Sequence, residues 1–427
     1  MADPNPFLDR IKSGVNDMYQ YDVTIVGGGL VGGSLACALA NTGLRVALIE
    51  AVSQQSRARP SYDERVIALS LGSQRIFEAI GVWPEMAPEA EPILKVRVSD
   101  RGHCAFTRLD HAEEGVEALG YVIPARAMGA AIQTALKYAG NLEIFCPAQL
   151  LTHRVGADGV ELNLLADGES VSLRTRLLVA ADGGQSGIRA GLDLQVREHA
   201  YGQDAIITTV TPDRPLRGVA FERFTDTGPL AMLPMTAGRY SVVWTCRDSE
   251  TADLLMLSDQ DFLDRLQVRF GFRLGRLGQV ASRRAYPLKF VLTRDSVQDR
   301  LVMIGNSAHT LHPVAGQGFN LGLRDVAGLA EVLADCAAAG DDPGATETLA
   351  GYRRWRGRDQ MATAGMTDAL ARLFVPDWTP LIMARAAGML AVDLIPPARH
   401  LLARRFMGLG GRQPRLACGL SLDGGRS

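Results

Sequence analysis

The stretch YDVTIVGGGLVGGSLACALANTGLRVALIE, residues 21–50, constrains the fold more than any other part of the sequence. An apolar, β-branched run leads into Gly27-x-Gly29-x-x-Gly32, apolar residues at helical spacing follow, and a second apolar run ends at Glu50. Strand, helix and strand in this order make a βαβ unit. The sequence therefore predicts an α/β fold of the Rossmann type, built on a parallel sheet.

The three glycines and the acid also indicate what this unit binds. One glycine makes the tight turn, one lets backbone N–H groups approach a pyrophosphate, and one lets the helix pack closely on the strand. Glu50 stands where a carboxylate accepts hydrogen bonds from ribose hydroxyls, which also argues against a 2′-phosphate. A purely structural glycine turn is the alternative. The fingerprint predicts a dinucleotide but does not distinguish FAD from NAD.

Two later segments repeat the passage from an apolar strand into a glycine-containing loop: RLLVAADGGQSGIR (176–189) and VMIGNSAHTLHPVAGQGFNLGLRD (302–325). In the second segment, a helix is expected to begin near Gly318. Ligands of open α/β sheets bind at the carboxyl ends of the strands, so we expect both loops to lie beside the first fingerprint. Their polar and glycine residues are Asp182, Gly183, Ser186 and Arg189 in the first loop and Gly305, Asn306, Pro313, Gly316, Gly318 and Asn320 in the second.

Composition and charge exclude several other classes of protein. The 45 Lys and Arg residues nearly balance the 47 Asp and Glu residues, so no overall field would attract nucleic acid. The six cysteines form no C-x-x-C pair, so neither a metal site nor a disulfide framework is expected. The N-terminus lacks the apolar core of a signal peptide, and the apolar segment 381–402 is interrupted by charges and two prolines. We expect a cytoplasmic protein.

Taken together, the three glycine-containing patterns resemble those of the single-component FAD-dependent aromatic hydroxylases. The patterns are G-x-G-x-x-G, D-G-x-x-S-x-x-R and the long G-[D/N]-x-A-H…P-x-x-G-Q-G-x-N-x-G…D. Within that family the sequence is most similar to the hydroxylases of ubiquinone biosynthesis, and above all to the 2-polyprenyl-6-methoxyphenol hydroxylases. The segments that carry this similarity are YDERVIALSLGSQRIFEAIGVW (62–83), VRVSDRGH (96–103), FERFTDTGPLAMLPM (221–235) and GNSAHTLHPVAGQGFNLGLRD (305–325).

The resemblance implies a Rossmann-like FAD-binding domain with an inserted antiparallel substrate-binding sheet and C-terminal helices. The expected parts are an N-terminal extension over 1–20, a discontinuous FAD-binding domain over 21–95, 116–198 and 291–345, the substrate-binding sheet over 96–115 and 199–290, a helical region over 346–410 and a flexible tail over 411–427.

FAD is the cofactor that the resemblance implies. Arg65 and Arg126 would line its phosphate side, or else be solvated charges on helix faces. Asn306 replaces an Asp that is common in the wider family, and its amide can still hydrogen-bond a ribityl hydroxyl. The complete set of implied cofactor contacts is Gly27, Gly29, Gly32, Glu50, Arg65, Arg126, Asp182, Gly183, Gly305, Asn306, Pro313, Gly316, Gly318 and Asn320.

Three further side chains are placed less specifically. Arg189 would either touch a pyridine nucleotide or pair with a neighbouring carboxylate. His309 and His312 flank the cofactor loop, and we expect them to pack or to donate and accept hydrogen bonds rather than to catalyse.

The resemblance also implies a reaction. NAD(P)H or another electron donor reduces the flavin, O2 forms a flavin C4a-hydroperoxide, and one oxygen atom enters the ring of a polyprenylated methoxyphenol. No catalytic side chain is expected, because the flavin carries the chemistry. Apolar residues of the inserted sheet, around 232–235 and including Phe221, Phe224 and Trp244 as candidates, would exclude water.

Several alternatives remain open from the sequence. A sister hydroxylase would act at another ring position or on another phenol. A prenyl reductase or halogenase would share the first fingerprint, although no W-x-W-x-I-P pattern is present. A simple NAD-dependent dehydrogenase would lack the second and third loops, and a scaffold would hold FAD without turnover. The run YRRWRGR (352–358) is either a solvated face or a face that meets a partner or the inner side of a membrane.

Overall fold

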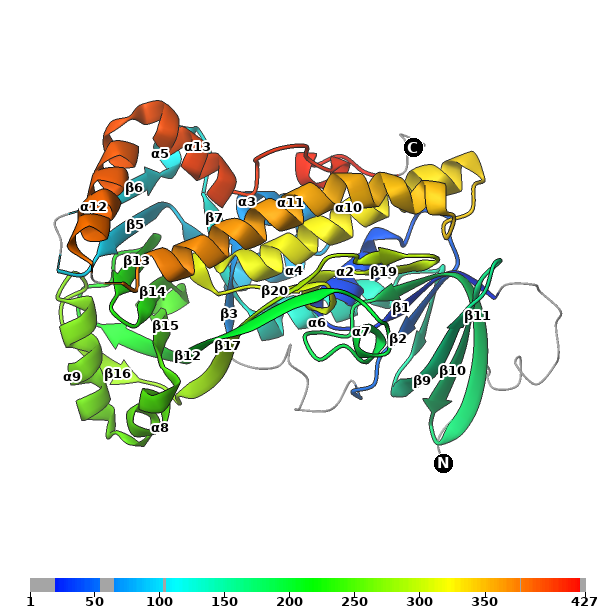
Figure 1. Ribbon diagram of the computed structural model, residues 1–427, viewed down its shortest axis with the longest axis horizontal. Coiled ribbons are helices and arrows are strands. Elements are labelled where there is room, and N and C mark those ends of the chain that lie inside the picture. The colour runs from blue at the N-terminus through cyan, green and yellow to red at the C-terminus, as the bar shows by residue number, and fades with distance from the viewer. Residues whose placement is uncertain (1–19, 54–64, 103–104, 377, 423–427) are drawn as a thin grey trace.

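The computed structural model of the protein describes residues 20–53, 65–102, 105–376 and 378–422. Residues 1–19 of the expected extension, residues 423–427 of the expected tail, and positions 62–64 and 103 of the quoted segments lie outside the described residues. Figure 1 shows a sheet toward each end of the molecule and two long helices that run side by side between them, α10 (Gln317–Ala339) and α11 (Thr346–Leu373).

The first sheet contains the predicted βαβ unit. Its central strand β1 pairs in parallel with β2 on one side and with β11 on the other. Parallel pairing continues from β11 to β19 and from β2 to β8, whereas the edge strand β18 is antiparallel. Strand β10 (Val160–Ala166) pairs antiparallel with β11, and β9 (Ala148–Val155) pairs antiparallel with β10, so both belong to the same sheet. The other strands are β1 (Tyr21–Val26), β2 (Val46–Ile49), β8 (Leu142–Phe145), β11 (Glu169–Ala180), β18 (Val297–Gln298) and β19 (Leu301–Met303). The prediction of a Rossmann-like α/β fold is confirmed.

The two faces of this sheet are buried by different elements. Val23 and Ile25 of β1 pack toward a core that includes residues of α2 (Leu30–Ala38), α6 (Ala125–Leu136) and α10. Val26, the residue after Ile25, points to the opposite face and belongs to a second core, to which β9 and β10 contribute. Successive residues of a strand point to opposite faces, so an almost continuous apolar run is what this two-sided burial requires.

The second sheet has the strand order β20-β17-β12-β15-β14-β13-β5-β6, with β16 beside β12. All its pairs are antiparallel except β13 with β5, which are parallel. This pair differs from the expected antiparallel sheet, because β5 and β6 form a hairpin from an earlier part of the chain that joins β13 in the same direction. The strands are β5 (Lys95–Asp100), β6 (Phe106–Asp110), β12 (Val196–Pro212), β13 (Val219–Thr225), β14 (Gly228–Pro234), β15 (Tyr240–Arg247), β16 (Leu277–Val280), β17 (Arg284–Thr293) and β20 (His309–Thr310).

Helix α9 (Asp259–Phe270) covers one face of the second sheet. Its Phe262, Leu266 and Phe270 recur every four residues and are fully buried, and Ser258 caps its start by accepting a hydrogen bond from the backbone of Asp261. The neighbouring helix α8 spans Asp248–Met256.

A small third sheet connects the two larger parts. It contains β3 (Val66–Ser70), β4 (Glu91–Ile93) and β7 (Gly120–Pro124), all antiparallel to their neighbours. Helix α3 (Leu71–Ala79) follows β3 directly, and the Ser70 hydroxyl accepts a hydrogen bond from the Ser73 N–H to cap it.

After α11 come α12 (Thr379–Leu394) and α13 (Pro396–Phe406), bent by 95° at the break between them. Within the described chain no single helix is long and apolar enough to cross a membrane, although this bent pair meets the length and composition criteria when taken together.

The prediction of a flexible tail over residues 411–427 is wrong for the first part of that segment. Residues Arg415–Cys418 form the short helix η6, with Leu416 and Ala417 buried in the main core. The backbone N–H of Arg415 also donates to the Glu331 carboxylate at 2.6 Å. Two buried apolar side chains and this hydrogen bond hold a segment that its glycine content had suggested was mobile.

Candidate active site

The three glycine-containing loops lie along one edge of the first sheet. Strands β19, β11 and β1 are neighbours and run parallel, so their carboxyl ends emerge together. Gly27 follows β1, Asp182 follows β11 and Gly305 follows β19 within two residues of each strand end. The sheet therefore assembles, from chain segments far apart in sequence, the site that the three patterns predict.

The three fingerprint glycines have separate structural reasons. Gly27 has a φ of +102°, and a Cβ there would lie 2.7 Å from the backbone carbon of Ala181. A Cβ on Gly32 would overlap the carbonyl oxygen of Gly27. By contrast, a Cβ on Gly29 would meet no atom within 4 Å and would point into open space. Gly27 and Gly32 are thus required by the fold, whereas Gly29 leaves room for a ligand.

Glu50 is fixed at the end of β2 by backbone groups. Its Oε2 accepts a hydrogen bond from the Gly28 N–H at 2.7 Å, and its Oε1 accepts one from the Val52 N–H at 2.7 Å. Each carboxylate oxygen keeps a second lone pair for a ligand hydroxyl. The side chain is therefore oriented toward the glycine turn before any ligand binds.

The loop after β11 is tied to the loop after β19. Asp182 accepts a hydrogen bond from the Ser307 hydroxyl at 2.9 Å, and that hydroxyl accepts one from the Gly183 N–H at 3.0 Å. The Arg189 guanidinium donates to the carbonyl oxygens of Ser307 and Gly184, at 2.9 Å and 2.6 Å. Among the described residues, the Arg189 guanidinium donates to backbone carbonyl groups and pairs with no carboxylate.

The loop before α10 is shaped from inside by Asn320. Its Oδ1 accepts hydrogen bonds from the Ser70 N–H at 2.9 Å and the Ser73 hydroxyl at 2.7 Å. Its Nδ2 donates to the carbonyl oxygens of Ala68 and Gly316, at 2.9 Å and 2.7 Å. These bonds use the full donor and acceptor capacity of the amide in a buried place, so Asn320 positions the loop and β3.

A cavity of about 1390 Å³ runs from the glycine turn of β1 to the second sheet and the C-terminal helices. Gly318 borders it with open space at its Cα, and Gly316 enters α10 with a φ of +61°. The lining includes these residues expected from the sequence: Gly27, Gly29, Glu50, Arg65, Asp182, Gly183, Asn306, Pro313, Gly316 and Gly318. Gly32, Gly305, Arg126 and Asn320 are outside the lining.

The family model of the FAD binding domain matches residues 20–361. The chain belongs to that FAD-binding family.

Two curated relatives match over most of their length. The ubiquinone hydroxylase UbiL of Rhodospirillum rubrum is 41% identical over 404 residues, covering 94% of this chain and 93% of the relative. The 3-demethoxyubiquinol 3-hydroxylase of Escherichia coli is 29% identical over 392 residues, covering 91% of this chain and 98% of the relative. Among solved structures, p-nitrophenol 4-monooxygenase from Pseudomonas putida superposes with a TM-score of 0.76 at 20% identity, covering 92% and 99% of the two chains. That last similarity supports the fold.

The residues fit FAD. The open space at Gly29 admits a pyrophosphate beside the start of α2, where free backbone N–H groups and the helix dipole favour an anion. Glu50 faces the same turn with spare acceptor positions. Gly318 and the amino end of α10 border the part of the cavity toward the second sheet, where a flavin ring would lie.

The two arginines predicted to contact FAD lie in different surroundings. Arg65 borders the cavity, with its guanidinium 4.9 Å from the centre of the Tyr286 ring. Arg126 forms a two-pronged ion pair with Glu89 at the surface, with one N–O distance of 2.8 Å. Arg65 therefore lines the cavity that fits FAD, whereas Arg126 does not.

Both histidines of the cofactor loop have hydrogen-bonding roles. His309 is buried, and its Nε2 lies 2.6 Å from the Asp325 carboxylate, which also accepts from Arg356. Burial alone would raise the pKa of Asp325, yet Arg356 and His309 lower it to about 2. His312 accepts a hydrogen bond from the Val314 N–H, and burial lowers the pKa of His312 to about 4, so its ring is neutral.

The apolar end of the FAD cavity is formed by the second sheet and the helices α12 and α13. Of the candidates from the sequence, Phe221, Phe224 and Leu233 line it, whereas Met232 and Trp244 pack into the core beneath α9. Alternation along β14 explains why Leu233 and Met232 differ, because Ala231 and Leu233 line the cavity whereas Met232 between them faces the core. From the helices come Leu381, Ala384, Met389, Val392, Leu402 and Phe406.

Two residues with ionisable side chains at this end were not predicted. Glu222 of β13 lines the cavity, and burial raises the pKa of its carboxyl to about 8, against a smaller lowering by a backbone hydrogen bond from Ala315. Arg385 of α12 donates to the carbonyl oxygens of Leu373 and Pro376 at 3.0 Å and lies 3.5 Å from Asp100. In the sequence, Glu222 looked like any polar residue in an alternating strand, so no local pattern could have singled it out.

Proposed function

We propose that the protein is an FAD-dependent monooxygenase of ubiquinone biosynthesis that inserts one oxygen atom of O2 into the ring of a polyprenylated phenol. The observation that carries this proposal is the single cavity that joins the FAD site to a long apolar chamber. A ring placed beside the flavin can extend an apolar tail toward α12 and α13. The names of the two relatives, a ubiquinone hydroxylase and a 3-demethoxyubiquinol 3-hydroxylase, support the substrate class.

Bound FAD supplies the chemistry, because its reduced ring reacts with O2 and transfers one oxygen atom to an electron-rich ring. The residues of this chain hold and shield it. The glycine turn and Glu50 bind the dinucleotide, Asn320 fixes the loop beside the ring, and the apolar walls of the second sheet exclude water. Glu222 lies in the chamber and is protonated at pH 7, because its pKa is about 8. The apolar surroundings therefore contain no buried charge at this position.

For the specific substrate we propose a polyprenyl-methoxyphenol, with NAD(P)H or another donor as the source of electrons. We also propose that the protein works in the cytoplasm, at the inner face of the membrane, since its substrate would carry a tail that partitions into lipid. Hydroxylation at another ring position is the nearest alternative, and a scaffold that holds FAD without turnover is the alternative of another class.

The test is a mass-spectrometric profile of prenylated quinone precursors in a strain deleted for this protein. Accumulation of a polyprenyl-methoxyphenol with a fall in ubiquinone is expected. A precursor blocked at another ring position would assign a sister hydroxylase. An unchanged profile would exclude ubiquinone synthesis, and a flavin that NAD(P)H and other donors cannot reduce would favour the scaffold.

A further inference from the structure

A second cavity, of about 850 Å³, lies between α10, α11, α13 and the loop that follows α13. None of the described residues that line it also lines the FAD cavity. Its only lining carboxylate within the described chain is Asp359, whereas six arginines border it: Arg324, Arg354, Arg358, Arg404, Arg405 and Arg412. The whole sequence has a net charge of −2, so the positive charge at this cavity arises from a local cluster of arginines and not from the overall composition.

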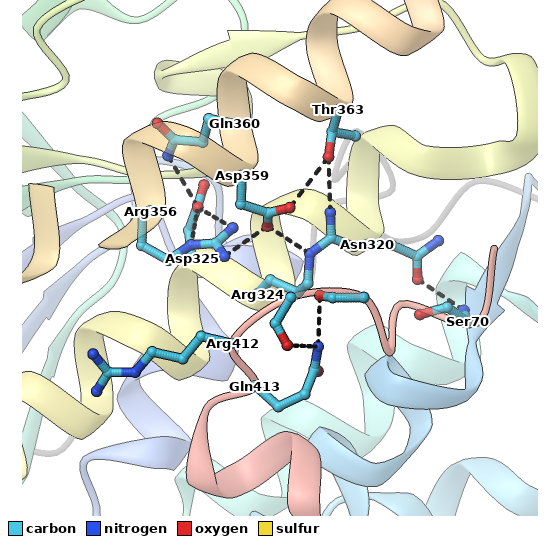
Figure 2. A network of polar contacts seen from close by, with 12 residues as sticks. Ser70, Asn320, Arg324, Asp325, Arg356, Asp359, Gln360, Thr363, Arg412 and Gln413 are labelled. Atoms are coloured by element: carbon cyan, nitrogen blue, oxygen red, sulfur yellow. Dashed lines mark hydrogen bonds and ion pairs between the residues drawn. The ribbon is translucent and has the colours of Figure 1, made fainter. Parts of the chain in front are cut away.

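The innermost arginine has an unused donor. Arg324 has a side chain that is 9% exposed, donates through Nε to Asp359 at 2.9 Å and through Nη2 to Thr363 at 3.2 Å, as Figure 2 shows. Its Nη1 is buried and has no hydrogen-bond partner in the described part of the chain. Buried donors in folded proteins are nearly always paired, so an acceptor from outside the chain is expected here.

Asp359, the one carboxylate that lines this cavity among the described residues, does not neutralise the outer arginines. Asp359 accepts hydrogen bonds from Arg324 and from Arg356, the latter at 2.7 Å, and its charge is shared between them (Figure 2). Among the described residues the side chains of Arg354, Arg358, Arg404 and Arg405 form no hydrogen bond or ion pair, and all four are exposed. Several free guanidinium groups around one hollow match the oxygens of a phosphate group.

Exposed apolar side chains lie next to the arginines. Leu401 borders the cavity and is 66% exposed, and on the same helix Leu402 and Phe406 border the FAD cavity. On α12, Met383 and Leu394 are 68% and 74% exposed. A phosphate site beside exposed apolar residues matches an amphiphile, because a soluble phosphate would leave those side chains in water.

We propose that this arginine cavity binds the phosphate headgroup of an anionic phospholipid while α12 and α13 rest their exposed apolar side chains on the bilayer. Helix α13 then stands between the headgroup site and the apolar end of the FAD cavity, so that a polyprenyl tail passes from lipid into the cavity without crossing water. The passage of a polyprenyl tail into the cavity rests on the proposed substrate, whereas the binding of lipid at the arginines does not.

The test is flotation of the FAD-loaded protein with phosphatidylcholine vesicles, with and without phosphatidylglycerol. Binding is expected only to vesicles that contain phosphatidylglycerol, and it should weaken as salt is added. The double variant Arg354→Gln/Arg358→Gln should raise the lipid concentration needed for half-maximal binding about tenfold or more. The control Arg154→Gln/Arg265→Gln removes the same charge from exposed positions outside the cavity and should bind as the unaltered protein does.

The proposal would be overturned by binding that does not depend on phosphatidylglycerol, by an equal loss in the control variant, or by calorimetric binding of inorganic phosphate at the cavity without any vesicle binding. The last would assign a soluble phosphate compound to the site. Vesicle binding does not require turnover, so the two proposals can fail separately. A protein that restores ubiquinone in cells but does not bind these vesicles would refute the lipid site and leave the proposed hydroxylation unaffected.

Discussion

The carbonyl oxygen of Gly27 occupies the position that a side chain on Gly32 would need, whereas the space at Gly29 is open. We therefore expect Gly32→Ala to prevent proper folding, because a methyl group pressed against backbone cannot be relieved by moving a side chain. The cost should be about 3 kcal/mol or more. Lower soluble yield and an earlier thermal unfolding transition are the measurements.

Gly29→Val tests the ligand side of the same turn. Its backbone conformation suits any residue and its Cβ meets no atom, so the fold should persist. The branched side chain would stand where the pyrophosphate binds, so the variant should purify colourless with an unchanged circular dichroism spectrum. A yellow variant with full FAD content would refute this assignment of the turn.

Asn320→Asp should weaken FAD binding without altering the cavity wall directly. The change removes the two donors to Ala68 and Gly316 and turns carboxylate oxygens toward those carbonyl groups. Leaving buried acceptors unpaired costs about 2 kcal/mol, so the Kd for FAD should rise about thirtyfold. Fluorescence titration of the apoprotein with FAD measures it.

Asn306→Asp is the matched control, since Asn306 is exposed at the cavity edge and carries the same amide. Its effect on the Kd should stay below about fivefold. Equal effects of the two substitutions would mean that Asn320 acts by touching FAD and not by holding the loop.

Arg65→Ala and Arg126→Ala should differ, although the sequence placed both beside the phosphates. Arg65 borders the cavity, so its loss should raise the Kd for FAD about tenfold. Arg126 pairs with Glu89 at the surface, where such pairs contribute about 0–1 kcal/mol to folding, and its loss should leave FAD binding unchanged. Comparable weakening by both substitutions, measured by the same titration, would contradict this distinction.

These contrasts show where prediction from the sequence succeeds and where it fails. The glycine loops were predictable because strand, turn and helix signals are local, and because parallel strands bring their carboxyl ends to one edge. The partner of Arg126, the inward bonds of Asn320 and the parallel pairing of β5 with β13 join residues far apart in the chain. No local pattern encodes such contacts.

The arginine cavity shows the same limit. It combines Arg324 of α10, residues 351–366 of α11 and residues 401–412 around the end of α13. In the sequence, YRRWRGR could equally be a solvated face. The packing of α11 against α10 determines which arginines line the cavity. It buries Arg356 against Asp325 and leaves Arg354 and Arg358 at the cavity.

Glu222→Gln should stabilise the protein increasingly as the pH rises. Burial raises the pKa of Glu222 from an ordinary 4.5 to about 8. The unfolded chain releases the proton near pH 4.5 while the folded chain retains it, so the glutamate makes folding less favourable above pH 4.5. This penalty grows by roughly 1 kcal/mol per pH unit and levels off near pH 8.

The glutamine removes that titration, so the two proteins should unfold alike at pH 4.5 and the variant should unfold at higher temperature at pH 8. Thermal unfolding followed by circular dichroism across this range measures the difference. Glu161→Gln, on the exposed side of β10, is the control and should show no such divergence. A gap between Glu222→Gln and the unaltered protein that stays constant with pH would mean that Glu222 is ionised in the folded state, and that the apolar chamber contains water or an unrecognised cationic partner for it.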